Sequence, residues 1–126
     1  MSTVLIVEDD ASVVTLLDTV LRTEGYDVAV ARDGLAGLLR LGTLEADAVV
    51  LDLAMPDVGG VRLLAQLAEE HDGTLPVPVL VVTGTADATA RVAPWVPAAD
   101  VFTKPFDPDA LLARLRVHLP AGGDRP

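Results

Sequence analysis

The sequence contains no cysteine, and this absence excludes two classes of site. Disulfides and thiolate metal centres cannot form, and a chain without cysteine fits a reducing compartment. No segment reaches the roughly 18 consecutive apolar residues that a membrane span needs. The first residues, MSTVLIVED, are too short and too acidic for a signal peptide. We therefore expect a cytoplasmic protein with no membrane partner.

Basic and aromatic residues are also scarce. Nine Lys and Arg stand against nineteen Asp and Glu, which gives a formal net charge of −10, and the chain has one Trp, one Tyr and two Phe. Nucleic-acid binding depends on cationic side chains that meet phosphates, and single-strand binding also depends on aromatic rings that stack on bases. We therefore expect that this chain does not contact nucleic acid directly.

Two kinds of apolar segment alternate along the chain. Five short segments, mostly rich in valine, predict strands at residues 3–7, 26–31, 47–51, 77–82 and 100–103. The longer segments between them have helical spacing. We expect their apolar stripes to pack in the core, and the second stripe consists of Leu35, Leu38, Leu39 and Leu41.

Strand and helix alternate five times, which predicts an α/β fold with a parallel sheet, right-handed crossovers and helices on both faces. The fourth helix, around residues 86–93, is short because Pro94 and Pro97 restrict it. We expect one domain over residues 1–119. Residues 120–126 are rich in Gly and Pro, and we expect a flexible tail or the start of a linker there.

Ligands of open parallel sheets bind beyond the carboxyl ends of the strands, so the residues that follow each strand are candidates for a site. These residues are Glu8, Asp9 and Asp10 after the first strand, Asp52 after the third, Thr83 and Gly84 after the fourth, and Lys104 and Pro105 after the fifth.

The carboxylates among these residues cannot all stay ionised without a cation or a shared proton, and both solutions are open at this point. A hard divalent cation fits, because Mg²⁺ takes one or two carboxylates and is often completed by phosphate oxygens; Mn²⁺ accepts similar ligands. The absence of cysteine, and of histidine near these strand ends, argues against zinc. Asp10 is better interpreted as the N-cap of the helix that begins at Ala11.

Lys104 and Thr83 complete a set that suits phosphoryl transfer. The ammonium of Lys104 is a compact partner for one phosphoryl oxygen, the hydroxyl of Thr83 can donate to another, and Gly84 leaves room. Such transfer depends mostly on positioning and on charge neutralisation. Asp52 then becomes the candidate nucleophile, through an aspartyl-phosphate.

Four segments, in this order and at the expected strand ends, resemble the receiver domain of two-component response regulators. They are VLIVEDD, VVLDLAMPDVGG, VLVVTGT and FTKPFDPDALLARL, and the resemblance extends over about residues 2–119. It implies a flavodoxin-like, doubly wound fold of three layers, with five strands in the order 2-1-3-4-5 and five helices.

The resemblance also implies roles for single residues. Glu8 and Asp9 match the acidic pair that binds Mg²⁺ together with Asp52, the phosphoacceptor, and the backbone carbonyl of Ala54 would be a further ligand. Thr83 matches the hydroxyl residue of the switch and Lys104 the lysine that contacts the phosphoryl group. Met55, Pro56 and Gly60 match the loop that follows the phosphoacceptor. The peptide bond between Lys104 and Pro105 would be cis.

One part of the pattern departs from the family. Receiver domains usually carry Tyr or Phe three residues before the lysine, where this chain has Val101. The neighbouring Phe102 should point to the other face of the sheet, because strand side chains alternate. The expected switch and output residues, on the face formed by the fourth helix, the fifth strand and the fifth helix, are Thr83, Trp95, Val101 and Phe102.

The leading hypothesis is a signalling switch that turns over no external substrate. A histidine kinase or a phosphotransfer protein would phosphorylate Asp52, and the output would reach an effector protein, a fused output domain or a homodimer linked to phosphorylation. A second hypothesis is an interaction module of receiver fold that works without phosphorylation. A flavin-binding electron carrier is disfavoured, because the acids after the first strand would repel the flavin phosphate.

Overall fold

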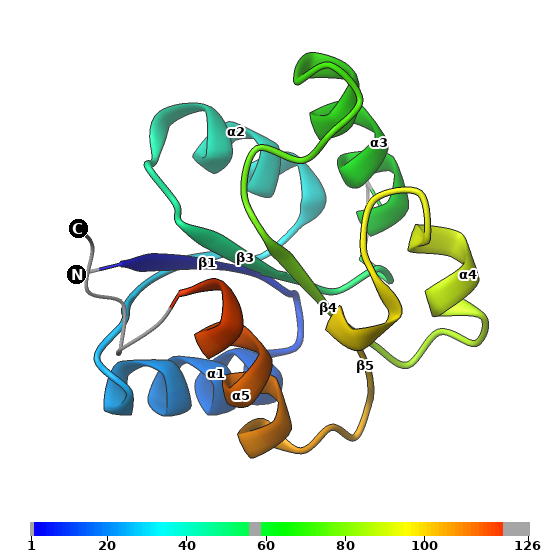
Figure 1. Ribbon diagram of the computed structural model, residues 1–126. Helices are drawn as coiled ribbons and strands as arrows, with labels where there is room; N and C mark the ends of the chain where they lie inside the picture. Colours follow the sequence, from blue (N-terminus) through cyan, green and yellow to red (C-terminus); the bar gives the residue numbers. More distant parts are fainter. Residues whose placement is uncertain (1, 56–58, 120–126) are drawn as a thin grey trace.

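A five-stranded parallel sheet forms the middle layer of the molecule (Figure 1). The computed structural model describes residues 2–55 and 59–119. Its strands, joined in the predicted order 2-1-3-4-5, are β1 (Thr3–Val7), β2 (Asp27–Ala31), β3 (Ala48–Leu51), β4 (Val79–Thr83) and β5 (Val101–Thr103). The predicted sheet is thus confirmed.

Helices cover both faces of the sheet and give the three predicted layers (Figure 1). On one face lie α1 (Ala11–Thr23) and α5 (Pro108–His118). On the other face lie α2 (Gly34–Thr43), α3 (Gly60–Glu70) and α4 (Ala88–Val92), and a short 3₁₀ turn at Ala98–Asp100 precedes β5. In the part of the chain that the structure describes, no helix is long and apolar enough to cross a bilayer.

The first strand has the predicted bounds, and the bounds of the other strands differ from the prediction by one or two residues. The fourth strand starts at Val79, because Pro78 has no N–H to donate, although its carbonyl still accepts from Val49 at 2.9 Å. The same strand ends at Thr83, which therefore belongs to β4 rather than to the loop after it. Asp100 lies in the 3₁₀ turn and not in the fifth strand.

The N-cap that the sequence predicts at Asp10 is confirmed, and the start of α5 has a similar cap. The Asp10 carboxylate accepts hydrogen bonds from the N–H groups of Ser12 and Val13, and so caps α1 as predicted. At α5, the Asp107 carboxylate accepts from the N–H of Asp109, and Pro108 occupies the first turn.

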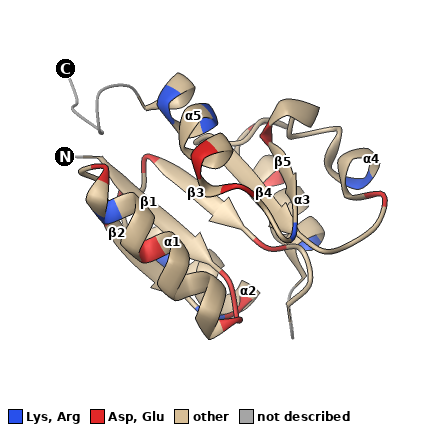
Figure 2. Ribbon diagram, turned by 90° about the horizontal axis from the view of Figure 1, so that it is seen from below, with Lys and Arg blue, Asp and Glu red and all other residues tan. Residues whose placement is uncertain are grey.

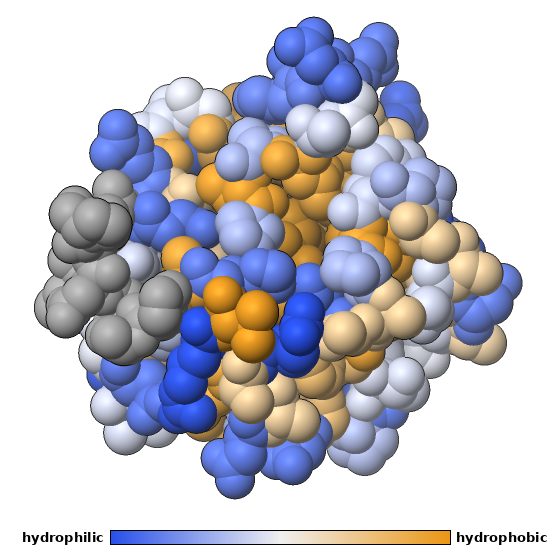
Figure 3. All heavy atoms as spheres, in the orientation of Figure 1, coloured by the Kyte–Doolittle hydropathy of each residue, from blue (hydrophilic) through white to orange (hydrophobic). Residues whose placement is uncertain are grey.

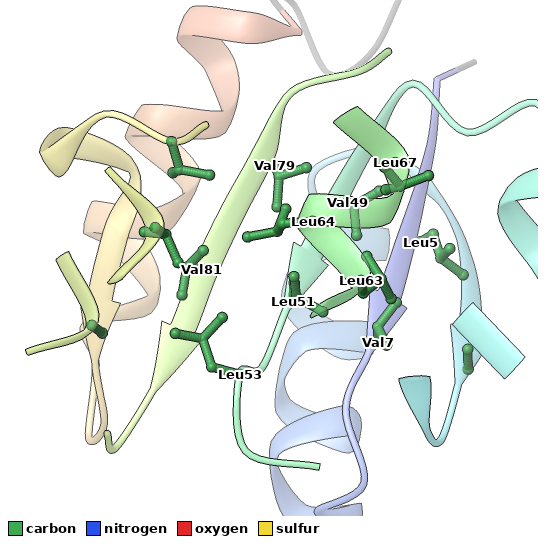
Figure 4. Close-up of a cluster of buried hydrophobic side chains, with 14 residues drawn as sticks. Leu5, Val7, Val49, Leu51, Leu53, Leu63, Leu64, Leu67, Val79 and Val81 are labelled. Atoms are coloured by element: carbon green, nitrogen blue, oxygen red, sulfur yellow. The ribbon is translucent and has the colours of Figure 1, made fainter. Parts of the chain in front are cut away.

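The core lies on both faces of the sheet because β1, β3 and β4 are almost entirely buried. Figure 4 shows the larger cluster, in which side chains of α3 pack onto the strands; its labelled members are Leu5, Val7, Val49, Leu51, Leu53, Leu63, Leu64, Leu67, Val79 and Val81. On the opposite face, leucines of α1 and α5 cover the other side chains of the same strands.

The prediction for the second leucine stripe is wrong for two of its four residues. Leu38 and Leu41 pack against the core, but Leu35 and Leu39 are 51% and 65% exposed. The reason is Gly37, where an added Cβ would lie 3.0 Å from Cγ1 of Val7. This close contact turns the glycine side of α2 toward the sheet, so the leucines at 35 and 39 point away from it.

The fifth strand behaves as its alternation predicts. Val101 packs in the cluster shared by α3, α4 and Trp95, whereas Phe102 packs on the face covered by α1 and α5. The two side chains thus lie on opposite faces of the sheet.

His118, the last residue of α5, contacts the buried carboxylate of Asp100, as does Arg114. Its Nε2 lies 2.9 Å from Oδ2 of Asp100, and Nε of Arg114 lies 2.9 Å from Oδ1 of the same carboxylate. Asp100 is only 2% exposed, and burial of a carboxylate requires such partners. These contacts fasten the 3₁₀ turn before β5 to α5.

Gly60 begins α3 in direct contact with the loop that follows β3. A Cβ added there would lie 2.6 Å from Cα of Leu53 and 2.7 Å from the carbonyl oxygen of Asp52. Since both are backbone atoms, Gly60→Ala should lower the free energy of unfolding by about 1–3 kcal/mol through overpacking. Urea unfolding measures this change.

Gly42→Ala is the matched control, because a Cβ at Gly42 in α2 meets nothing within 4 Å. It should raise the free energy of unfolding by about 0.5–1 kcal/mol, since alanine is the better helix former. Equal urea midpoints for the two variants would contradict the close contact at Gly60.

Candidate functional site

An acidic cluster lies where β1 and β3 end (Figure 2). The register of the sheet places Val7 beside Leu51, so the residues that follow them, Glu8 and Asp52, are neighbours. Together with Asp9 they bring one carboxylate oxygen each to within 4.8 Å of one another. The predicted convergence of these three acids is present in the structure.

The three acids differ in burial and in their hydrogen bonds. Glu8 and Asp52 are 2% and 4% exposed, whereas Asp9 is exposed to solvent. Oε2 of Glu8 accepts from the backbone N–H groups of Asp9 and Asp10 at 3.1 and 3.2 Å. Oδ1 of Asp52 accepts from the N–H of Ala54 at 3.2 Å. Each buried carboxylate is thus held by the loop that follows its strand.

Lys104, directly after β5, contacts both buried acids. Its Nζ lies 2.7 Å from Oε1 of Glu8 and 3.3 Å from Oδ2 of Asp52. The longer contact is a hydrogen bond, whereas Oε1 of Glu8 accepts none of regular geometry and is a buried oxygen in close ion contact only. Such an oxygen has lone-pair capacity left for a cation, and the cluster offers only oxygen ligands, which Mg²⁺ prefers.

The electrostatics of this cluster shift two pKa values. The pKa of Glu8 is raised from 4.5 to about 7, chiefly by burial. The contact with the Lys104 ammonium and the backbone N–H of Asp10 oppose this rise, and the nearby Asp52 carboxylate adds to it. Burial lowers the pKa of Lys104, but the ion pair with Glu8 and the charge of Asp52 outweigh it, so the net shift is upward. The lysine therefore stays cationic.

Thr83 is fully buried at the end of β4, and its hydroxyl is engaged with the following loop. It donates to Oγ1 of Thr85 at 3.0 Å and accepts from the N–H of Thr85 at 3.2 Å. Its carbonyl accepts from the N–H of Lys104 at 2.9 Å, which ties the ends of β4 and β5 together. At the next residue, a Cβ added to Gly84 would meet nothing within 4 Å, so this position is open.

The remaining candidate residues lie around the cluster. The Lys104–Pro105 peptide bond is cis. Met55 is partly buried against the core, and Gly60 supports the backbone after Asp52. Pro56 lies outside the described residues.

Arg32 was not among the candidates, because the end of the second strand looks like an ordinary helix entry. Its Nη2 donates to the backbone carbonyl of Asp9 at 2.9 Å and so fastens the loop that carries Asp9. The signal that could have revealed it is a cation at the end of β2, the strand that pairs with β1. The next residue, Asp33, is the N-cap of α2.

The comparisons with known proteins agree on one family. The model of the family described as "Response regulator receiver domain" matches residues 4–116. The DNA-binding response regulator MtrA of Mycobacterium tuberculosis is 36% identical over 124 residues, which is 98% of this chain and 53% of MtrA. The sensory transduction protein RegX3 of Mycobacterium bovis is 38% identical over 125 residues, again 98% of this chain and 53% of the relative. The chain thus spans about half the length of these curated relatives.

Solved structures give the same result for the fold. The receiver domain of the Francisella response regulator 1452 superposes with a TM-score of 0.82 at 26% identity, over 94% of this chain and 96% of that chain. The chemotaxis protein CheY4 of Vibrio cholerae superposes with a TM-score of 0.81 at 25% identity, over 94% and 99% of the two chains.

The raised pKa of Glu8 predicts how stability depends on pH in the absence of metal. Between pH 4.5 and about 7, the folded protein keeps a proton on Glu8 that the unfolded chain has lost. The contribution of Glu8 to the free energy of unfolding therefore falls as pH rises through this window. With a metal chelator present, the free energy of unfolding of Glu8→Gln relative to that of the wild type should be higher at pH 8 than at pH 5. Urea unfolding at both pH values measures the difference, and a difference independent of pH would contradict the shift.

Proposed function

The chain belongs to the response regulator receiver domain family, and on that premise we propose that it is a phosphorylation-dependent signalling switch that carries its phosphoryl group on Asp52. The observation that supports this most is the meeting of two buried carboxylates, one exposed carboxylate and a lysine at a single sheet edge. The work of such a site is charge neutralisation around a transferred phosphoryl group.

We propose that Mg²⁺, or Mn²⁺ in its place, is the cofactor of this site. The carboxylates of Glu8, Asp9 and Asp52 would hold the ion with the backbone carbonyl of Ala54. The all-oxygen donor set and the buried Oε1 of Glu8 support this assignment. When bound, the ion neutralises negative charge on the acids and on phosphoryl oxygens.

The phosphoryl donor is a phosphohistidine of a sensor kinase or phosphotransfer protein. A carboxylate oxygen of Asp52 attacks the phosphorus, the phosphorus–nitrogen bond breaks, and the histidine leaves. Lys104 lies 3.3 Å from Oδ2 of Asp52 and is placed to pair with an oxygen of the transferred group. Attack by water on the phosphorus later releases phosphate and regenerates Asp52, so no external substrate is turned over.

The output is a change of the face formed by α4, β5 and α5. The Thr83 hydroxyl would exchange its bond with Thr85 for one with a phosphoryl oxygen, which releases the loop that leads to α4. Trp95 and Val101 pack in the cluster next to α4, while Phe102 lies on the other sheet face. The changed face would act on an effector protein, a fused output domain or a second copy of the chain.

The MtrA relatives are DNA-binding response regulators, and they extend well beyond this chain. For the receiver part itself we propose no direct nucleic-acid contact, because its formal charge is −10.

A cytoplasmic location fits a partner of sensor kinases, and residues 120–126 would begin a linker or tail. An interaction module that needs no phosphorylation is the second candidate, and the valine at 101 favours it because a rotating aromatic side chain is missing there.

Incubation with a small phosphodonor and Mg²⁺, followed by intact mass, tests the proposal. The wild type should gain one phosphoryl group, and Asp52→Asn should gain none, because its amide is not a nucleophile. No gain in the wild type, together with no Mg²⁺ binding, would contradict the switch and favour the second candidate.

Two neighbouring acids give the matched control. Asp9→Ala should abolish phosphorylation that depends on Mg²⁺, because it removes a ligand. Asp10→Ala should keep the phosphoryl gain and cost only about 1 kcal/mol of stability, the typical value of a helix cap. Equal loss of phosphorylation in both variants would contradict the separate roles of the two acids.

The proposed output face predicts which residues respond. Phosphorylation of the wild type should shift the amide resonances of β5 and of residues 86–97, because the loop released by Thr83 leads there. Amide spectra before and after phosphorylation measure these shifts, with Thr83→Val as the control that cannot bond the phosphoryl group. If these resonances stay unchanged in a fully phosphorylated wild type, the output must lie on another face.

A further inference from the structure

A groove with a volume of about 760 Å³ opens between α2 and α3, at the opposite end of β3 from the acidic cluster. Figure 3 shows apolar surface gathered in this hollow, with polar residues around it. Most of its apolar lining comes from leucines and one valine: Leu35, Leu38, Leu39, Leu41, Leu44, Leu67 and Val77.

Two glycines of α2 differ in their surroundings. At Gly37 the helix lies so close to the sheet that an added Cβ would come within 3.0 Å of Val7 and 3.3 Å of Leu63. At Gly42, more than one turn later, an added Cβ would meet nothing within 4 Å. The Gly37 side of α2 is thus in tight contact with the sheet, whereas Gly42 lies on another side of the helix and lines the groove.

The groove carries exposed apolar surface that the fold itself does not bury. Among the described residues, the large exposed hydrophobic side chains are Leu16, Leu35, Leu39 and Val117, and two of these four line the groove. Contiguous exposed apolar surface bordered by polar residues is typical of protein interaction sites.

Acidic side chains and one histidine, His71, border the groove. Its lining includes Glu45, Asp47 and Glu70, and no Lys or Arg is among the described residues that line it. The Asp47 carboxylate is already engaged, because it accepts from the N–H of Thr3 at 2.7 Å, so the acids that matter most here are Glu45 and Glu70. A second copy of this chain, with a formal charge of −10, would meet repulsion here, whereas a cationic partner would be attracted.

We propose that this groove binds an amphipathic helix of a partner protein, with apolar residues that enter the hollow and with Lys or Arg at its borders. Helices that lie in apolar grooves use anchors three or four residues apart, and Leu35 and Leu39 present apolar surface at that spacing. Because the groove lies at the far end of β3, it stays accessible while the acidic cluster is engaged.

A synthetic amphipathic helix, with leucines every three or four residues among lysines, is the probe. Fluorescence anisotropy of the labelled peptide with the full chain should show saturable binding at a single site. A scrambled peptide of the same composition keeps the charge but has no apolar face, and it should bind at least about tenfold more weakly.

Two variants of α2 test the location. Leu39→Gln removes an exposed anchor and Gly42→Leu fills the open space, and each should weaken binding by about tenfold. Leu16→Gln on α1 and Gly42→Ala are their controls and should bind like the wild type. All four positions are exposed or open, and circular dichroism of each variant checks that it is folded.

The outcomes separate the groove from its alternatives. Weaker binding in Leu39→Gln and Gly42→Leu, with wild-type binding in both controls, supports the proposal. Equal binding of the scrambled peptide, or equal effects of Leu39→Gln and Leu16→Gln, would show attraction by charge alone and overturn it. A dimer of the wild-type chain in sedimentation that Leu39→Gln dissolves would assign the groove to a second copy and also overturn it.

Discussion

The carboxylates of Glu8 and Asp52 are buried next to each other at one edge of the sheet, and the ammonium of Lys104 contacts both. Buried like charges cost free energy unless cations and hydrogen bonds compensate for them. Backbone N–H groups supply part of the compensation, two to Glu8 and one to Asp52. These groups compensate the negative charge of the two carboxylates only in part. The charge that is left suits this edge of the sheet to a divalent cation, which in turn can bind phosphoryl oxygens.

The rest of the fold places these groups within reach of one another. Pairing of β1 with β3 brings the two acids together, and the bond from Lys104 to the carbonyl of Thr83 holds the end of β5 beside β4. Arg32 fastens the loop that carries Asp9. The groove between α2 and α3 lies at the other end of the strands, so the two surfaces can be engaged at the same time.

The sequence predicts the sheet and the acidic cluster well, because both follow from short-range patterns. Buried valine-rich runs predict the strands, and the residue after each strand predicts the site. The misses depend on tertiary contacts. Leu35 and Leu39 have helical spacing, but the close contact at Gly37, far away in the sequence from Val7, decides which side of α2 meets the sheet. His118 and Arg32 have partners 18 and 23 residues away, and nothing in the local sequence indicates them.

The roles assigned to the acids, the lysine and the threonine depend on a divalent cation next to Asp52. The most direct measurement is a crystal structure of the protein grown with Mn²⁺, with anomalous scattering recorded at the manganese edge. We predict a single strong peak among the carboxylates of Glu8, Asp9 and Asp52 and the carbonyl of Ala54. No peak at that edge of the sheet at saturating Mn²⁺, or a peak only elsewhere on the molecule, would contradict the assignment.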